Sequence, residues 1–170
     1  MNVTLIGMAG AGKSHIGNLL AKKLGLEFID VDRHLWERMY RKTVQEILDE
    51  RGEKWFLDEE ERLIIDHTKG KDGLLISPPG SVVYRPKAMV HLKAMSKVIY
   101  LRVPFETIEA RVKGTPPRGI VGLGNKTLRE LYDERTPMYE SNADMTIDTE
   151  GKSSEEVAKQ IVSFLTLSTS

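Results

Sequence analysis

One stretch near the N-terminus restricts the fold more than any other. Residues 7–14 read GMAGAGKS, a glycine-rich segment that ends in lysine and serine. An apolar run at 3–6 precedes it and an amphipathic segment at 14–24 follows, so it joins a predicted strand to a predicted helix. Glycines let such a turn direct its backbone N–H groups inward, and the helix N-terminus adds a positive dipole end. The segment therefore predicts a cradle for phosphate groups.

The spacing of the cradle gives its last residues distinct chemical tasks. Lys13 can reach the β- and γ-phosphates of a nucleotide, and the hydroxyl of Ser14 can ligate Mg²⁺. We therefore predict that the loop binds a nucleotide together with Mg²⁺. The residues expected to hold the nucleotide at this loop are Gly10, Ala11, Gly12, Lys13, Ser14 and His15.

Strand and helix patterns alternate along the rest of the chain. Further apolar runs predict strands at residues 27–31, 74–76, 97–103 and 145–147. Amphipathic segments predict helices at residues 33–50, 56–68, 87–95, 104–112, 128–139 and 154–167. This alternation predicts an α/β protein with a doubly wound parallel sheet, of the P-loop NTPase and nucleoside-monophosphate-kinase-like type. We expect a single domain over residues 1–170.

The composition excludes several classes of site and partner. The chain has 170 residues and no cysteine, so it has neither disulfides nor thiolate metal sites. Its 25 lysines and arginines equal its 25 aspartates and glutamates, which gives no charge surplus for nucleic acid or an anionic membrane. No run approaches the ~20 apolar residues of a membrane span. We expect a cytoplasmic monomer whose partner is a small-molecule acceptor.

Two other classes of nucleotide-binding protein fit the sequence less well. A GTPase needs an Asn-Lys-x-Asp motif to read its base, but residues 125–128 read NKTL, and the DTEG at 148–151 follows in the wrong order. A motor or remodelling ATPase usually has an apolar strand that closes in two acidic residues. The strand at 74–76 is instead followed by Ser77 and Pro78. The small phosphotransferases remain.

Two carboxylates lie at the end of the second predicted strand, in FIDVD at residues 28–32. On a strand, Asp30 and Asp32 would share a face. Beside the phosphate loop, one can help to hold Mg²⁺, and the other can accept the proton of a substrate hydroxyl or orient it. We assign Asp30, with Ser14, to the metal and Asp32 to catalysis and substrate binding. The alternative is an acidic turn that caps the next helix.

Several segments together resemble the shikimate kinase family over nearly the whole chain. They are the phosphate loop, FIDVD, GEKWFLDEEE at 52–61, SPPGSVV at 77–83, a loop that carries Arg118, and DERTPMYESNAD at 133–144. The resemblance implies that the γ-phosphoryl group of ATP is transferred, with Mg²⁺, to a hydroxyl of a small metabolite. It also implies acceptor-binding helices at about 33–68 and a lid at about 112–125.

The same resemblance assigns roles to four more residues. Arg118 would be a catalytic arginine of the lid, above the phosphates. Arg111 would pack on the adenine. Arg135 would meet the carboxylate of the acceptor, and Gly80 would bind the acceptor at the end of the third strand.

Two departures from the family pattern fall on the acceptor side. Leu57 stands where the family has an arginine for the acceptor carboxylate, and Pro78 and Pro79 replace two glycines of a Gly-Gly-Gly strand end. Proline has no N–H to donate, and a lost charge-assisted contact costs about 1.5–3 kcal/mol. We therefore expect an acceptor site altered from that for shikimate. Trp55 and Leu57 suggest an apolar wall, and the favoured alternative for Trp55 is an aromatic that packs in the core or under the lid. The alternatives are an authentic shikimate kinase and a nucleotide-binding regulator whose acceptor site has decayed.

Overall fold

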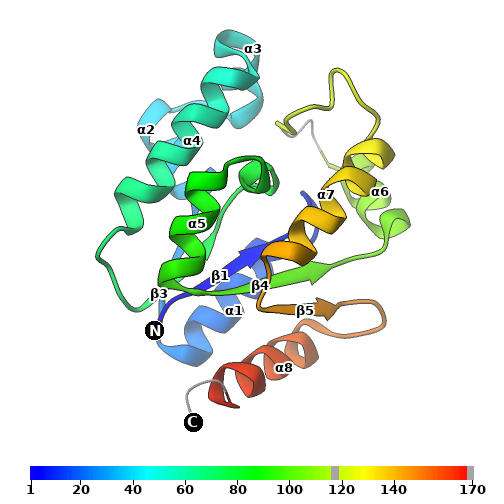
Figure 1. The fold of residues 1–170 in the computed structure, drawn as a ribbon. Coiled ribbons are helices and arrows are strands. Elements are labelled where there is room, and N and C mark those ends of the chain that lie inside the picture. The colour runs from blue at the N-terminus through cyan, green and yellow to red at the C-terminus, as the bar shows by residue number, and fades with distance from the viewer. Residues whose placement is uncertain (116–118, 168–170) are drawn as a thin grey trace.

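Five parallel strands form one sheet in the order β2-β3-β1-β4-β5 in the computed structural model, which describes residues 1–115 and 119–167 (Figure 1). The strands are β1 (Val3–Ile6), β2 (Glu27–Asp30), β3 (Leu74–Ser77), β4 (Lys97–Arg102) and β5 (Met145–Asp148). The chain crosses from one side of β1 to the other after β3. The predicted α/β class with a doubly wound parallel sheet is confirmed.

Helices connect all of these strands. The α-helices are α1 (Lys13–Leu24), α2 (Arg38–Tyr40), α3 (Val44–Arg51), α4 (Glu53–Thr68), α5 (Pro86–Met95), α6 (Phe105–Lys113), α7 (Leu128–Asn142) and α8 (Ser154–Leu167). A π-helical turn, η1 (Val31–Glu37), follows β2, and a 3₁₀ turn, η2 (Gly80–Tyr84), follows β3.

The single helix expected over residues 33–50 is wrong, because the chain breaks there into η1, α2 and α3. Arg41 adopts a left-handed conformation with φ of 52°, which ends α2. Thr43 then starts α3 with a capping box. The Thr43 side chain accepts from the Glu46 N–H, and the Glu46 carboxylate accepts from the Thr43 N–H. The sequence predicts helix content here but not the interruption.

Both faces of the sheet are covered by helices (Figure 1). On one face, α1 and α8 pack on each other and bury a cluster that includes Leu5, Leu20 and Ile161. On the other face, α4, α5 and α7 bury a larger cluster that includes Ile64 and Tyr100. Because both faces are buried, the central strands are continuous apolar runs rather than alternating ones.

Three strand ends that lie far apart in the sequence meet at the carboxyl edge of this sheet. Strand β3 lies between β2 and β1, and Asp30 of β2 pairs in register with Ser77 of β3. The phosphate loop after β1 and the proline-containing turn after β3 therefore lie next to the end of β2. In open parallel sheets this edge is where ligands bind.

Candidate active site

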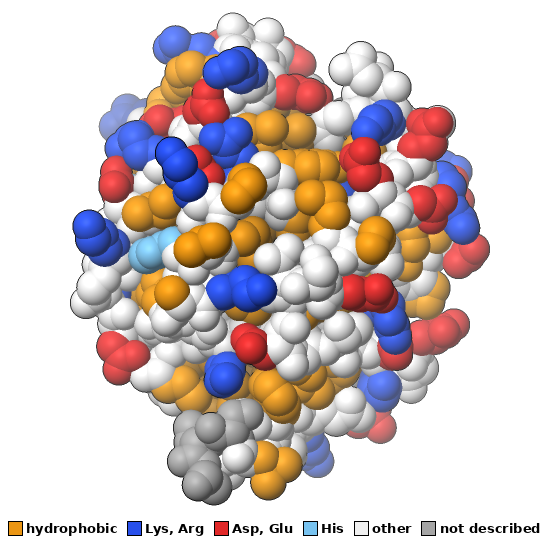
Figure 2. Space-filling view, in the orientation of Figure 1, with side chains coloured by type: hydrophobic (Ala, Val, Ile, Leu, Met, Phe, Trp, Pro, Cys, Tyr) orange, Lys and Arg blue, Asp and Glu red, His pale blue; other side chains and the backbone are white. Residues whose placement is uncertain are grey.

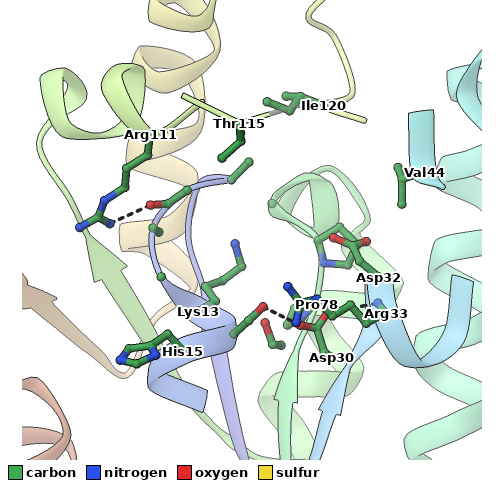
Figure 3. A pocket seen from close by; sticks show the side chains of 18 of the residues that line it. Lys13, His15, Asp30, Asp32, Arg33, Val44, Pro78, Arg111, Thr115 and Ile120 are labelled. Carbon is green, nitrogen blue, oxygen red and sulfur yellow. Dashed lines mark hydrogen bonds between the residues drawn. The ribbon is translucent and has the colours of Figure 1, made fainter. Parts of the chain in front are cut away.

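One cavity of about 940 Å³ opens at this carboxyl edge (Figure 3). It extends from the phosphate loop to the acceptor-side helices on one side and to the loop before α8 on the other. The predicted site residues that line it are Gly10, Ala11, Gly12, Lys13, Ser14, His15, Asp30, Asp32, Gly80, Arg111 and Arg135. Arg118 lies outside the described residues. Every other predicted site residue is thus brought to one cavity.

The phosphate loop adopts the backbone geometry that its glycines allow. Gly10 and Gly12 have φ of 82° and 88°, a region that disfavours other residues, and a Cβ on Gly7 would lie 2.9 Å from the Leu101 carbonyl oxygen. The Lys13 ammonium donates to the carbonyl oxygens of Gly7 at 2.9 Å and Met8 at 3.0 Å. The loop therefore holds a positive charge at its opening, where phosphate oxygens would need it.

Ser14 and Asp30 form a hydrogen-bonded pair beside the phosphate loop. The Ser14 hydroxyl donates to Asp30 Oδ2 at 2.5 Å, and Asp30 is only 5% exposed. Hydroxyl and carboxylate oxygens are the hard ligands that Mg²⁺ prefers, usually with waters and substrate phosphates completing its shell. The two side chains fit a magnesium ion beside a bound triphosphate.

Asp30 and Asp32 do not share the face of a strand, so that expectation is wrong. Strand β2 ends at Asp30, which caps η1 by accepting from the Arg33 N–H at 3.4 Å, while its own N–H donates to His34 Nδ1 at 3.2 Å. Asp32 lies in the first turn of η1. Both carboxylates nevertheless line the cavity, because the π-helical turn begins at the carboxyl edge of the sheet.

Arg135 of α7 is a buried cation at the acceptor end of the cavity. It is 1% exposed, its Nε donates to Tyr84 Oη at 3.2 Å, and its Nη2 donates to the Val121 carbonyl oxygen at 2.5 Å. Burial opposes its charge, but the hydroxyls of Tyr139 and Tyr84 outweigh this, and the net effect raises the pKa of Arg135. Within the described part of the chain, no carboxylate forms an ion pair with it. A buried guanidinium that is charged and not paired with a carboxylate is suited to bind an anion.

The turn after β3 has a proline wall and one obligatory glycine. Pro78 and Pro79 line the cavity and offer it no N–H groups. A Cβ on Gly80 would lie 3.1 Å from the Gly7 carbonyl oxygen and 3.3 Å from Arg135 Nη1. The close approach of the phosphate loop and Arg135 thus requires glycine at this position.

Glu60 matches a family glutamate near the missing acceptor arginine, but sequence reasoning gave it only a weak role and did not predict the buried polar pair that it forms behind this turn. Ser81 lines the cavity, and its hydroxyl donates to Glu60 Oε2 at 2.7 Å. Glu60 is fully buried, and its Oε1 has no hydrogen-bond partner in the part of the chain that the structure describes. Burial, reinforced by the nearby charge of Asp32, raises the pKa of Glu60 to about 8. The signal in the sequence was weak, because Glu60 lies in an acidic helical segment that looks solvated.

Trp55 and Leu57 are not a wall of the cavity, so that expectation is also wrong. Both are partly buried and pack against the core, where Trp55 lies 6.3 Å from the Trp36 ring, and Trp36 stacks on Phe56 at 4.5 Å. Neither is among the residues that line the cavity. Apolar side chains do line its acceptor end, but they come from Val44 and Ile120.

The described end of the expected lid packs against the acceptor-side helices. A Cβ on Gly119 would lie 2.4 Å from Val44 Cγ1, so the backbone there is in close contact with α3. The Gly122 N–H donates to Glu53 Oε1 at 2.6 Å, at the start of α4. Together with the Arg135 bond to Val121, this fixes residues 119–122 across the acceptor end.

The opposite end of the cavity has a shape suited to the nucleotide base. Arg111 Nη1 donates to the Gly10 carbonyl oxygen at 2.8 Å, so its side chain is anchored beside the phosphate loop (Figure 3). Thr149, Lys152 and Ser154, from the loop before α8 and its start, line the same end. No motif in the sequence indicated these three residues.

Comparison with known proteins agrees with this geometry. A family model described as shikimate kinase matches residues 9–166. The shikimate kinase of Persephonella marina is 36% identical over 161 residues, which cover 95% of this chain and 96% of that protein. The shikimate kinase of Thermodesulfovibrio yellowstonii is 39% identical over 163 residues, which cover 95% and 92%.

Solved structures of kinases share this fold. Shikimate kinase from Acinetobacter baumannii, in complex with shikimate, superposes with a TM-score of 0.86 at 29% identity, and covers 98% of this chain and 93% of that chain. Deoxyadenosine kinase from M. mycoides, with bound dATP, shares the fold alone, with a TM-score of 0.61 at 18% identity over 98% of this chain and all of that chain. By its sequence and its fold, this ATP-binding chain belongs to the shikimate kinase family of phosphotransferases, which use an alcohol group as acceptor.

Proposed function

We propose that this protein transfers the γ-phosphoryl group of ATP to a hydroxyl of shikimate. The family match and the relatives that are named shikimate kinase support shikimate itself better than the altered acceptor expected from the sequence. The neighbour from Acinetobacter baumannii, with which this fold superposes closely, was solved with shikimate bound.

The observation that carries the proposal is the state of Arg135. Its guanidinium is 1% exposed, lines the cavity and forms no ion pair in the described part of the chain. A buried charge that has only neutral hydrogen-bond partners is unfavourable, and a ligand of opposite charge would offset that cost. The carboxylate of shikimate would supply that charge while a hydroxyl faces the phosphate loop.

In this proposal the chain works mainly by positioning and by neutralising charge. Lys13 holds the β- and γ-phosphates, and Ser14 and Asp30 hold Mg²⁺, which when bound neutralises charge on the phosphate oxygens. Asp32 orients the attacking hydroxyl and accepts its proton. Gly80 lies beside the acceptor. The closure of residues 112–125 as a lid and the role of Arg118 over the phosphates stay predictions.

One observation favours a second candidate, a hydroxylated acceptor other than shikimate. Leu57 stands where the family pattern has a charged contact, and its side chain packs on the core away from the cavity. A single guanidinium, Arg135, would then meet the acceptor carboxylate. The loss of one charge-assisted contact costs about 1.5–3 kcal/mol, which would lower the affinity for shikimate about tenfold or more.

ADP release with shikimate and with its methyl ester, which lacks the carboxylate charge, tests both candidates. We expect wild-type turnover of shikimate and a loss of about 100-fold in kcat/KM for the ester. Arg135→Lys keeps the charge but loses the planar donor pair, so it should discriminate about tenfold less between the two substrates. No shikimate-dependent ADP release from the wild type would reject the first candidate in favour of the second.

The other expectations concern membrane association, oligomeric state, cellular location and nucleic-acid binding. No helix in the described ranges is both long enough and apolar enough to cross a membrane. The monomeric state, the cytoplasmic location and the lack of a nucleic-acid partner stay predictions from the sequence. Gel filtration at the concentration used for the kinetic assays would test the first of these.

A further inference from the structure

We propose that the Ser81 hydroxyl, held in place by the buried carboxyl group of Glu60, is an acceptor-binding group that contacts a hydroxyl of the acceptor. Glu60 and Ser81 lie in two of the segments that carry the family resemblance, 52–61 and 77–83, but the resemblance gave no role to Ser81 or to its bond with Glu60. The inference rests on the proposed function, because it takes shikimate as the molecule that enters this end of the cavity.

The geometry places Ser81 where an acceptor would lie. Ser81 follows Gly80 in η2 and lines the cavity, although it is only 3% exposed. Its neighbour Gly80 lies close to both Arg135 and the phosphate loop, since a Cβ there would be 3.3 Å from Arg135 Nη1 and 3.1 Å from the Gly7 carbonyl oxygen. Ser81 therefore follows directly on a residue that lies between the proposed carboxylate contact and the phosphate loop.

The bond to Glu60 determines that the Ser81 hydroxyl can only accept a hydrogen bond from a ligand. The hydroxyl donates its proton to Glu60 Oε2 at 2.7 Å, so its oxygen keeps lone pairs for another partner. The adjacent Pro78 and Pro79 have no N–H groups, so this wall is poor in donors. A wall of that kind favours a ligand group that donates a hydrogen bond. An acceptor hydroxyl is such a group, whereas a carboxylate is not.

The surroundings of Glu60 support a positioning role rather than an ion pair. Asp32 of η1, Arg135 of α7 and Arg85 after η2 are the charged groups that influence it, and none forms an ion pair with it within the described residues. One helical turn earlier on α4, the residue is Leu57. Burying a carboxyl group that makes one hydrogen bond is unfavourable, so its bond to Ser81 needs a reason beyond stability.

The first test compares kinetic constants of Ser81→Ala, Glu60→Gln and the double variant. Loss of one hydrogen bond to the acceptor should raise KM for shikimate about tenfold in Ser81→Ala, with kcat and KM for ATP within about threefold. Glu60→Gln should raise the same KM by a smaller factor. The double variant should match Ser81→Ala within about twofold, because both changes remove one contact.

A matched control is Ser96→Ala, which deletes another buried hydroxyl far from the cavity. The Ser96 hydroxyl donates to the Leu92 carbonyl oxygen at 2.7 Å and contacts Thr4 Oγ1 at 2.7 Å. We expect this variant to keep the wild-type KM for shikimate, whatever it does to stability. Melting temperatures of all variants show which of them fold, and Ser81→Cys, which has nearly the same shape but a weak hydrogen-bonding group, replaces Ser81→Ala if that variant does not.

The second test identifies the contact with shikimate analogues that lack either hydroxyl remote from the transferred phosphoryl group. Wild type should discriminate about tenfold against one analogue, and Ser81→Ala should lose that discrimination. If wild type uses shikimate but Ser81→Ala keeps both its KM and its discrimination, the Ser81 assignment is wrong and the proposed function stands. If wild type releases no ADP with shikimate, both are wrong, and the two failures are distinguished by wild-type turnover alone.

Discussion

Lys13 shows how much a single residue contributes at the nucleotide end. Its ammonium donates to the carbonyl oxygens of Gly7 and Met8, at the start of the loop where it is expected to neutralise phosphate charge. We expect Lys13→Met to keep the fold, because Lys13 is only partly buried and the two carbonyl oxygens that it contacts belong to the backbone. It should abolish turnover and most of the rise in melting temperature that ATP produces. Normal turnover in this variant would rule out the assigned role of the loop.

Glu60 gives a prediction about pH at the same scale. Burial raises its pKa to about 8 in the folded protein, from an ordinary value of 4.5. Between these values the folded state binds a proton that the unfolded state does not, so the unfolding free energy falls as pH rises through this window. Glu60→Gln lacks that proton, so its melting temperature should fall less steeply than that of the wild type between about pH 5 and pH 8. Parallel curves would mean that Glu60 is ionised in the folded protein.

At the scale of elements, the start of α4 holds the chain segment that follows the expected lid. The Gly122 N–H donates to Glu53 Oε1 at 2.6 Å, and the carbonyl of Val121 accepts from Arg135 at 2.5 Å. These bonds cross the acceptor end of the cavity, so the position of this segment and the binding of acceptor are coupled.

We expect Glu53→Ala to release this segment without unfolding the protein. The Gly122 amide should exchange its hydrogen faster, and KM for shikimate should rise about threefold to tenfold, since the variant loses one charge-assisted hydrogen bond. Lys54→Ala is the control, because Lys54 is the next residue of α4 and its ammonium forms an ion pair with the exposed Asp58. Unchanged exchange at Gly122 in Glu53→Ala would show that the bond does not hold the segment.

At the scale of the whole molecule, the sheet separates two buried clusters that differ in their distance from the cavity. The cluster under α4, α5 and α7 adjoins the acceptor end of the cavity, and the other cluster lies between the sheet and α1 and α8 on the opposite face (Figure 1). On the surface, acidic and basic side chains are interspersed, as the view in Figure 2 shows. The second cluster includes Leu165, which is 2% exposed near the end of α8. Its packing should therefore affect stability more than catalysis.

Leu165→Ala tests this separation. We expect it to lower the unfolding free energy by about 2–5 kcal/mol in urea denaturation, because it leaves a cavity in a close-packed core. KM for shikimate should stay within about twofold of the wild-type value when the assay is run below the melting temperature. Ser163→Ala, an exposed change two residues earlier, should alter neither quantity. A large rise in KM for Leu165→Ala would show that the two faces are coupled.

The amino-acid sequence by itself determined the local parts of this protein. The phosphate loop is one contiguous segment whose glycine conformations and helix start follow from residues 7–14 alone, and strand and helix types follow from apolar spacing. The carboxylates at the end of the second predicted strand pointed to Asp30 and Asp32, the resemblance to a known family added Gly80 and Arg135, and the fold brings all four to one cavity. These successes concern residues within, or next to, recognisable motifs.

Only the tertiary structure decided which side chains those motifs meet. Apolar spacing predicted a helix through Arg41, but a left-handed residue and a capping box divide it. Trp55 and Leu57 turn to the core rather than to the cavity, and Glu60 is buried although its neighbours in sequence are acidic. The physical reason is that the direction of a helical side chain depends on which face of its helix packs against the rest of the molecule. That packing joins residues far apart in the chain, such as Glu60 and Ser81, and local pattern carries no information about it.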